Sequence, residues 1–261
     1  MNALLKMNRS KWSGVREDLS LNMKRIQLIT VRTALAIFCA STFPAFADDE
    51  EGVAIAIVHD TSGSMNEVVK DDAGKPAPKY RVANRALVAI ANRIEGFLTN
   101  SAATAQRKVH TGLFVFQKDG PRAALPFGPF DAAALREWAQ KFSNPTGGTP
   151  LGNALSAAGR AVLNSGLTRK HVLVITDGMN TVGPNPAVTL PNLQREAARK
   201  QTGLSVHFVA FDVEAKVFDG VKKLGATVVG AANESQLNSQ LEYILEKKIL
   251  LEDEEPPKKS N

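Results

Sequence analysis

Three oxygen-bearing side chains stand at alternating positions in the segment HDTSGSMN, residues 59–66: those of Asp60, Ser62 and Ser64. They directly follow the apolar run from Val53 to Val58, whose β-branched composition predicts a strand buried on both faces. Small side chains spaced by two can point the same way, and a carboxylate combined with hydroxyls is a ligand set for a hard cation. An ordinary turn rich in Ser, Gly and Asp is the structural alternative.

Two further segments carry oxygen ligands beside predicted elements. GGTP, residues 147–150, opens a predicted helix, although Thr149 before Pro150 also has the pattern of an N-cap followed by a first helical residue. Asp177 directly follows the apolar segment KHVLVIT, residues 170–176, although Asp-Gly after a strand is also a frequent turn. Each segment alone is a weak signal; together with Asp60, Ser62 and Ser64 they supply five oxygen-bearing side chains.

The elements that must position these side chains alternate between strand and helix. Strands are predicted at 53–58, 109–116, 170–176, 205–211 and 226–231, with a short antiparallel edge strand at 122–127. Helices are predicted at 80–98, after an Asp131 N-cap, at 151–162, at 191–202, and after an Asn233–Gln236 capping box. The alternation predicts an α/β fold with a doubly wound, mainly parallel central sheet and helices on both faces.

Ligands of such sheets bind at the carboxyl ends of the strands, where the strand order reverses. If the 170–176 strand lies beside the first strand, Asp60 and Asp177 are neighbours across that point. Thr149 then enters from the side. The sequence therefore predicts a single cluster at one edge of the sheet.

The three motifs D-T-S-G-S-M, G-G-T-P-L and I-T-D-G, in this order, resemble the metal-ion-dependent adhesion site (MIDAS) of the von Willebrand factor type A (VWA) domain family. The similarity covers about residues 50–250. It implies a Rossmann-like fold and a divalent cation held by Asp60, Ser62, Ser64, Thr149 and Asp177. It also implies that the hydroxyls bind the cation directly, that one or both aspartates act through water, and that the partner is a protein.

Oxygen-only ligands suit Mg²⁺ or Mn²⁺, with Ca²⁺ also possible. Two carboxylates and three neutral hydroxyls form a cage of low charge, so the ion keeps positive charge and attracts a further anionic oxygen. We therefore expect a non-enzymatic binding module that recognises an Asp or Glu of a partner protein through the cation. The polar segments 66–79 and 178–186 are expected to set specificity, and Met65 and Met179 to be packing residues.

Two alternatives stay open. A Mg²⁺-dependent hydrolase would use the same edge of the sheet, but the chain has no G-x-x-x-x-G-K-[S/T], G-x-G-x-x-G or G-x-S-x-G motif. A scaffold with a vestigial site would make its contacts through the last helix or the tail. The four histidines, at 59, 110, 171 and 207, are interpreted as structural, and Asp212 as a loop cap or part of the rim.

The first 47 residues have the pattern of a secretion signal. Lys24 and Arg25 precede the apolar core 34–40, and the small-x-small pattern 45–47 predicts cleavage after Ala47. Met23 is a possible alternative start, and an uncleaved anchor is the alternative to cleavage. Cys39, the only cysteine, lies in this leader, so the mature chain is expected to have no disulfide.

The charge of the chain is concentrated in the leader. Of the net +6, residues 1–47 contribute +5, with seven basic and two acidic residues, which leaves 25 basic and 24 acidic residues in the remainder. This balance gives no support to a nucleic-acid partner. We expect a periplasmic or secreted protein of the cell envelope with no transmembrane span in the mature chain, a VWA domain at 48–251 and a disordered charged tail at 252–261.

Overall fold

The computed structural model describes residues 49–100, 107–117 and 120–251. The leader 1–47, its expected cleavage site and the tail 252–261 lie outside these residues. The strands are β1 (Glu50–His59), β2 (Val68–Lys70), β3 (Pro76–Pro78), β4 (Lys108–Gln117), β5 (Gly120–Pro129), β6 (Leu167–Thr176), β7 (Ser205–Phe211) and β8 (Thr227–Ala231). The α-helices are α2 (Lys79–Thr99), α3 (Ala132–Lys141), α4 (Leu151–Leu163), α5 (Pro186–Arg199), α6 (Asp219–Lys222) and α7 (Glu234–Ile244). Short 3-10 turns η1 (Gly63–Asn66) and η2 (Ala215–Phe218) and a π-helical end η3 (Leu245–Leu250) complete the order.

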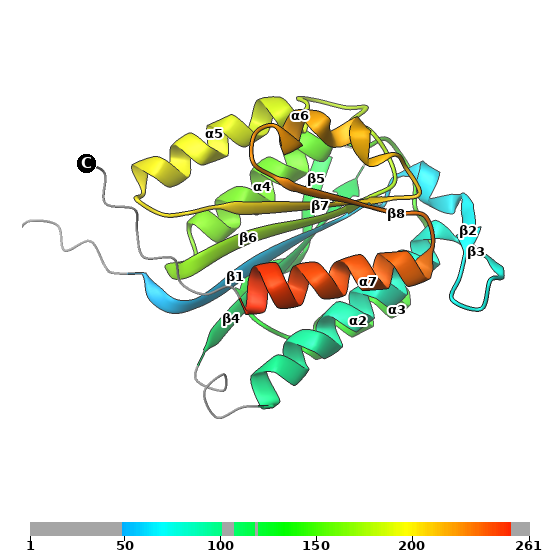
Figure 1. The fold of residues 1–261 in the computed structure, drawn as a ribbon, viewed down its shortest axis with the longest axis horizontal. Helices are drawn as coiled ribbons and strands as arrows, with labels where there is room; N and C mark the ends of the chain where they lie inside the picture. The colour runs from blue at the N-terminus through cyan, green and yellow to red at the C-terminus, as the bar shows by residue number, and fades with distance from the viewer. Residues whose placement is uncertain (1–48, 101–106, 118–119, 252–261) are drawn as a thin grey trace, which may run out of the picture. The chain divides into compact units, whose positions relative to one another are not determined.

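The central sheet has the strand order β5-β4-β1-β6-β7-β8 (Figure 1). Every neighbouring pair in it is parallel except β4 and β5, which are antiparallel. In the middle, β1 pairs with β4 on one side and with β6 on the other, so the strand order reverses at β1. The sheet confirms the predicted fold class, and the adjacency of β1 and β6 is the one that the predicted cluster requires.

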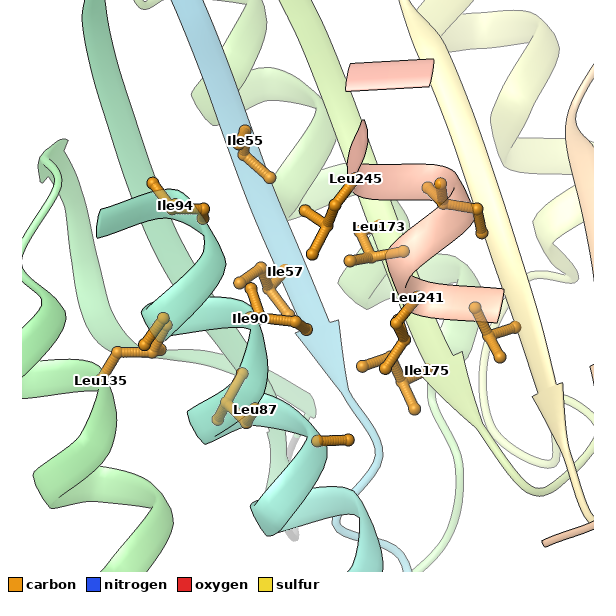
Figure 2. Packing of buried hydrophobic residues seen from close by; sticks show 14 of the residues in the cluster. Ile55, Ile57, Leu87, Ile90, Ile94, Leu135, Leu173, Ile175, Leu241 and Leu245 are labelled. Carbon is orange, nitrogen blue, oxygen red and sulfur yellow. The ribbon is translucent and has the colours of Figure 1, made fainter. Parts of the chain in front are cut away.

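Two cores form because β1 alternates between the faces of the sheet. Val53, Ile55 and Ile57 face the cluster formed with α2, α3 and α7, and Figure 2 shows Ile55 and Ile57 beside side chains of α2 and α7. The residues between them, Ala54 and Ala56 among them, face the cluster formed with α4, α5 and α6. The first strand is therefore buried on both faces, as its composition predicts.

Several boundaries differ from the sequence-based predictions. The antiparallel edge strand β5 is ten residues long rather than the short 122–127 segment. Helix α5 begins at Pro186 instead of 191, because Asn185 caps it by accepting a hydrogen bond from Ala187 N at 2.8 Å. The segment 66–79 is not a plain loop, since it contains the β2–β3 hairpin.

Other local predictions are confirmed. The Asp131 carboxylate caps α3 by accepting a hydrogen bond from Ala134 N, and Asn233 caps α7 by accepting one from Gln236 N. Within the described part of the chain, no helix is long and apolar enough to cross a membrane.

Candidate metal centre

Asp60 and Asp177 follow the ends of the two neighbouring central strands, β1 and β6. The Asp60 backbone N–H donates to Ile175 O at 3.0 Å, which fixes the end of β1 against β6. Both aspartates are buried, with Asp60 fully so. The predicted proximity of the two loops is therefore present in the structure.

The two serine hydroxyls lie between these carboxylates. The Ser62 and Ser64 Oγ atoms are 3.0 Å apart, and Ser64 Oγ donates to Asp177 Oδ1 at 2.8 Å. The Ser62 backbone N–H donates to Asp60 Oδ1 at 2.8 Å. Four of the five candidate ligands thus form one continuous network at the carboxyl edge of the sheet.

Thr149, the fifth candidate ligand, lies on the neighbouring loop. A methyl group built on Gly178 would lie 3.9 Å from Ser64 Oγ and 4.0 Å from Thr149 Oγ1, so both hydroxyls border the same small space. The N-cap of α4 is Pro150, with no side-chain capping bond. The alternative interpretation of Thr149 as a helix cap is therefore wrong.

Backbone hydrogen bonds hold the three loops together. Gly63 N donates to Gly147 O at 3.0 Å, and Thr146 N donates to Thr61 O at 2.9 Å. On the other side, Thr181 N donates to Thr149 O at 3.0 Å. These main-chain contacts join the three loops that carry the candidate ligands.

The chemistry of Asp60 fits a nearby cation. Its bonded donors are neutral: the Ser62 N–H, and the Thr176 hydroxyl at 2.5 Å from Oδ2. Burial raises the pKa of Asp60 to about 6, against the opposing effect of these hydrogen bonds and with a further contribution from the Asp177 charge. A buried carboxylate in this setting lacks a compensating positive charge, which a divalent ion would supply.

Lys79 is a buried charged residue near the centre that the sequence analysis missed. It is only 2% exposed, and its Nζ lies 3.2 Å from Asp177 Oδ2, 2.7 Å from Glu67 Oε2 and 3.0 Å from Asp212 Oδ2. Burial disfavours its charged form, but the bonds to Glu67 and Asp212 and the charge of Asp177 outweigh burial and raise its pKa. One sequence signal existed: a lysine at the first position of a helix opposes the helix dipole.

Two of three further residues near the centre have the structural role that the sequence predicted. His59 is buried, with its ring 5.4 Å from that of Trp138 in an edge contact, as expected for a structural histidine. Met65 is buried beside Tyr80, also as expected. Met179 is 62% exposed, so its interpretation as a packing residue is wrong.

Three of the five candidate ligands are hydroxyls. Among the described residues there is no group of three or more His, Cys, Asp or Glu side chains that is arranged to hold a metal. The candidate set fits a hard cation through a mixture of two carboxylates and three hydroxyls, which matches the oxygen preference of Mg²⁺ and Mn²⁺.

The fold and the three loops define a class of domain. Residues 55–180 match the family model of the von Willebrand factor type A domain. These residues are therefore similar to the VWA domain family. A search of curated proteins found no match to the chain.

Three solved structures show the same fold at low identity. The PilB minor pilin from Streptococcus sanguinis has 15% identity and a TM-score of 0.54, with 76% of this chain and 62% of the pilin covered. The proximal thread matrix protein 1 from the mussel byssus, solved with a zinc-occupied MIDAS motif, has 17% identity and a TM-score of 0.56, with 76% and 48% covered. The vWF domain of the type V pili tip protein Mfa5 from Porphyromonas gingivalis has 14% identity and a TM-score of 0.53, with 76% and 96% covered. The chain thus spans about three fifths of the pilin and half of the thread matrix protein, and at these identities the likeness concerns the fold.

Proposed function

We propose that this domain is an exported, non-enzymatic binding module that recognises an acidic side chain of a partner protein through a divalent cation. The observation that carries the proposal is the hydroxyl pair of Ser62 and Ser64, placed between the carboxylates of Asp60 and Asp177 at the reversal point of the sheet. The ion is Mg²⁺ or Mn²⁺, with Ca²⁺ possible. The zinc in the mussel thread matrix protein makes Zn²⁺ a further ion to test.

Each candidate ligand has a role in this proposal. The hydroxyls of Ser62, Ser64 and Thr149 would hold the cation, while Asp60 and Asp177 supply negative charge. When bound, the cation supplies a positive charge that attracts a carboxylate of the partner. Because hydroxyls are neutral and Asp177 already faces the ammonium of Lys79, the cage neutralises little of the ion's charge.

The loop after β6 borders the centre with apolar side chains. Met179 and Val182 are 62% and 49% exposed, and a methyl group on Gly148 would lie 2.8 Å from Val182 Cγ2. Val182 therefore lies over the loop that carries Thr149. We propose that the partner offers its acidic residue beside apolar surface, because exposed apolar side chains next to a polar site favour protein contacts.

Calorimetric titration of Mg²⁺ and Mn²⁺ into the purified exported protein tests the metal requirement. We expect saturable binding in the wild type and its loss in Asp60→Ala. Asp219→Ala removes an exposed carboxylate on α6 and is the matched control, which should bind like the wild type. If all three proteins bind the ion equally, the proposed centre is not the metal site. If none binds it, the free wild-type domain does not hold the ion, and the proposed metal requirement fails for the wild type.

Capture of the partner on the immobilised protein tests the bridging role. A partner that is released by EDTA and is not captured by Asp60→Ala supports the proposal. A partner that survives EDTA but is lost when residues 252–261 are deleted would favour the scaffold alternative. Metal-dependent phosphatase activity that Asp60→Asn abolishes would favour the hydrolase.

Export is tested by mass spectrometry of the protein recovered outside the cytoplasm. We expect Asp48 as the N-terminal residue. An N-terminus that precedes Asp48 would overturn the cleavage prediction.

A further inference from the structure

Lys79 joins three carboxylates that come from different parts of the chain. Glu67 precedes the β2–β3 hairpin, Asp177 follows β6, and Asp212 follows β7. The side chain of Lys79 is 3% exposed, whereas those of Glu67 and Asp212 are 68% and 38% exposed. The ammonium is therefore the buried centre of an acidic cluster that opens to solvent through Glu67 and Asp212.

The two oxygens of Asp177 have different partners. Oδ1 accepts the hydrogen bond of Ser64 at 2.8 Å, and Oδ2 faces Lys79 Nζ at 3.2 Å. The carboxylate is thus shared between the candidate centre and the lysine. It cannot turn both oxygens toward the centre without leaving the ammonium.

We propose that Lys79 is a positioning residue that weakens cation binding by holding Asp177 Oδ2 away from the centre. The proposal rests on the metal-dependent function proposed above. Lys79 leaves Asp177 to act through Oδ1 and Ser64, and adds a positive charge beside the cation. The positive charge of the ion is then only partly neutralised in the free protein. The carboxylate of a partner supplies the missing negative charge.

Glu67 and Asp212 set how strong this effect is. Each carboxylate bonded to the ammonium cancels part of its charge, so their removal leaves more positive charge facing Asp177 and the cation. Glu67 is the better residue to substitute because most of its side chain is exposed to solvent. Its replacement therefore changes the charge of Lys79's surroundings without opening a buried space.

The test is calorimetric titration of Mg²⁺ alone into Lys79→Met of the purified exported protein. We expect Mg²⁺ to bind about tenfold more tightly than in the wild type, because the variant loses a positive charge near the ion and frees Asp177. Lys75→Met removes an exposed lysine between β2 and β3 and is the matched control, with an expected change below about twofold because exposed charges are screened by solvent and salt. Equal or weaker Mg²⁺ binding in Lys79→Met would overturn the proposal.

Glu67→Gln provides an independent test that does not depend on the folding of Lys79→Met. We expect two- to threefold weaker Mg²⁺ binding, on the order of what one partly screened charge produces. Unchanged or tighter binding would contradict the proposal. Where Lys79→Met folds, Glu67→Gln should have no effect in that background, since Glu67 acts through Lys79; an undiminished effect would also overturn the proposal.

Mg²⁺ binding by the wild type distinguishes failure of this inference from failure of the proposed function. If neither the wild type nor Lys79→Met binds Mg²⁺, both are wrong. If the wild type binds Mg²⁺ and Lys79→Met binds it no more tightly, only the role of Lys79 is wrong. If Lys79→Met alone binds the ion, the lysine suppresses the site and the proposal is supported.

Discussion

The two ends of the central strands both hold buried ionisable side chains, but the balance of charge differs between them. At the carboxyl ends, Asp177 and Asp212 face the ammonium of Lys79, whereas the buried Asp60 carboxylate has neutral hydrogen-bond donors. The carboxylates outnumber the cation even before Glu67 is included. Negative charge is therefore in excess at this end.

Toward the amino ends of β6 and β7, the buried groups are basic. The Lys170 ammonium bonds to Asp49, to the Leu167 carbonyl and, at 2.9 Å, to the Thr202 hydroxyl. His171 Nδ1 lies 3.4 Å from His207 Nε2, with the rings stacked. The Lys170 ammonium is thus satisfied by hydrogen bonds within the protein, and burial keeps the two imidazoles neutral.

The comparison shows which kind of buried polarity indicates a ligand. Buried polar side chains occur at both ends, and at the amino end the ammonium of Lys170 is satisfied by hydrogen bonds within the protein. Only the carboxyl end combines an excess of one charge with hydroxyls that border a shared space. An unmatched charge, rather than burial of polar groups as such, distinguishes the candidate metal centre.

The largest expected effect is the loss of stability that low pH causes through the buried histidines at the amino ends of the strands. Burial, together with the nearby charges of His207 and Arg169, lowers the pKa of His171 to about 3, and burial with Lys248 lowers that of His207 to about 4. Both rings are neutral in the folded protein but take up a proton near pH 6.5 when unfolded. Their contribution to stability is therefore complete above pH 6.5 and is lost as the pH falls toward 4, by about 1.4 kcal/mol per pH unit for each ring.

Urea unfolding across pH 7 to 4 measures this loss. His207→Phe should show a shallower decline of the free energy of unfolding with falling pH, because one buried ring of the pair is gone, while His171 and His59, whose pKa burial also lowers to about 4, still contribute. His110→Phe retains the pair and serves as the control, with the decline of the wild type. An identical pH dependence in all three proteins would exclude the pair as the acid-sensitive element.

Substitution by alanine should be far more destabilising at a glycine near the carboxyl ends of the strands than at a helical glycine elsewhere. A methyl group on Gly152, in α4, would lie 1.9 Å from Pro184 O, so helix and loop would have to separate. On Gly96, in α2, the nearest atom would be Asn100 Nδ2 at an ordinary 3.8 Å. Gly152→Ala should lose about 3 kcal/mol of unfolding free energy, whereas Gly96→Ala should gain up to about 1 kcal/mol from better helix propensity.

Thermal and urea unfolding of the two alanine variants test this contrast in one experiment. Because Thr149 directly precedes Pro150, the cap of α4, and Asp177 begins the loop after β6, Gly152→Ala should also weaken Mg²⁺ binding. Equal stability changes in the two variants would mean that the close approach of α4 to the loop is not a constraint.

The fold was predictable because its signals are local. Apolar β-branched runs marked the strands, and Asp131 and Asn233 marked two helix starts that the structure confirms. The start of α5 was missed: the helix was predicted from residue 191, whereas Asn185 caps it and Pro186 is its first residue. Pro191 lies inside that helix, where a pattern of residues gives no sign that a proline is accommodated.

The candidate ligands were predictable for the same reason, and Lys79 was not. Asp60, Ser62 and Ser64 share one short motif, whereas the partners of Lys79 come from three separated segments. Nothing in the local spacing links Lys79 to Asp212, whose backbone adopts a positive φ of 53° at the end of β7. Charge pairs formed by tertiary structure are visible only once the strand order has been established.

The smallest expected effect concerns a single hydrogen bond at the carboxyl end. Thr176, the buried last residue of β6, donates its hydroxyl to Asp60 Oδ2 at 2.5 Å. Thr176→Val keeps the shape but removes the donor, and should cost about 1–2 kcal/mol of unfolding free energy in EDTA because a buried carboxylate loses a partner. Thr176→Ser keeps the hydroxyl and should lie closer to the wild type. If Ser and Val cost the same, the side chain matters through its methyl group and packing, and the polar network around Asp60 does not depend on it.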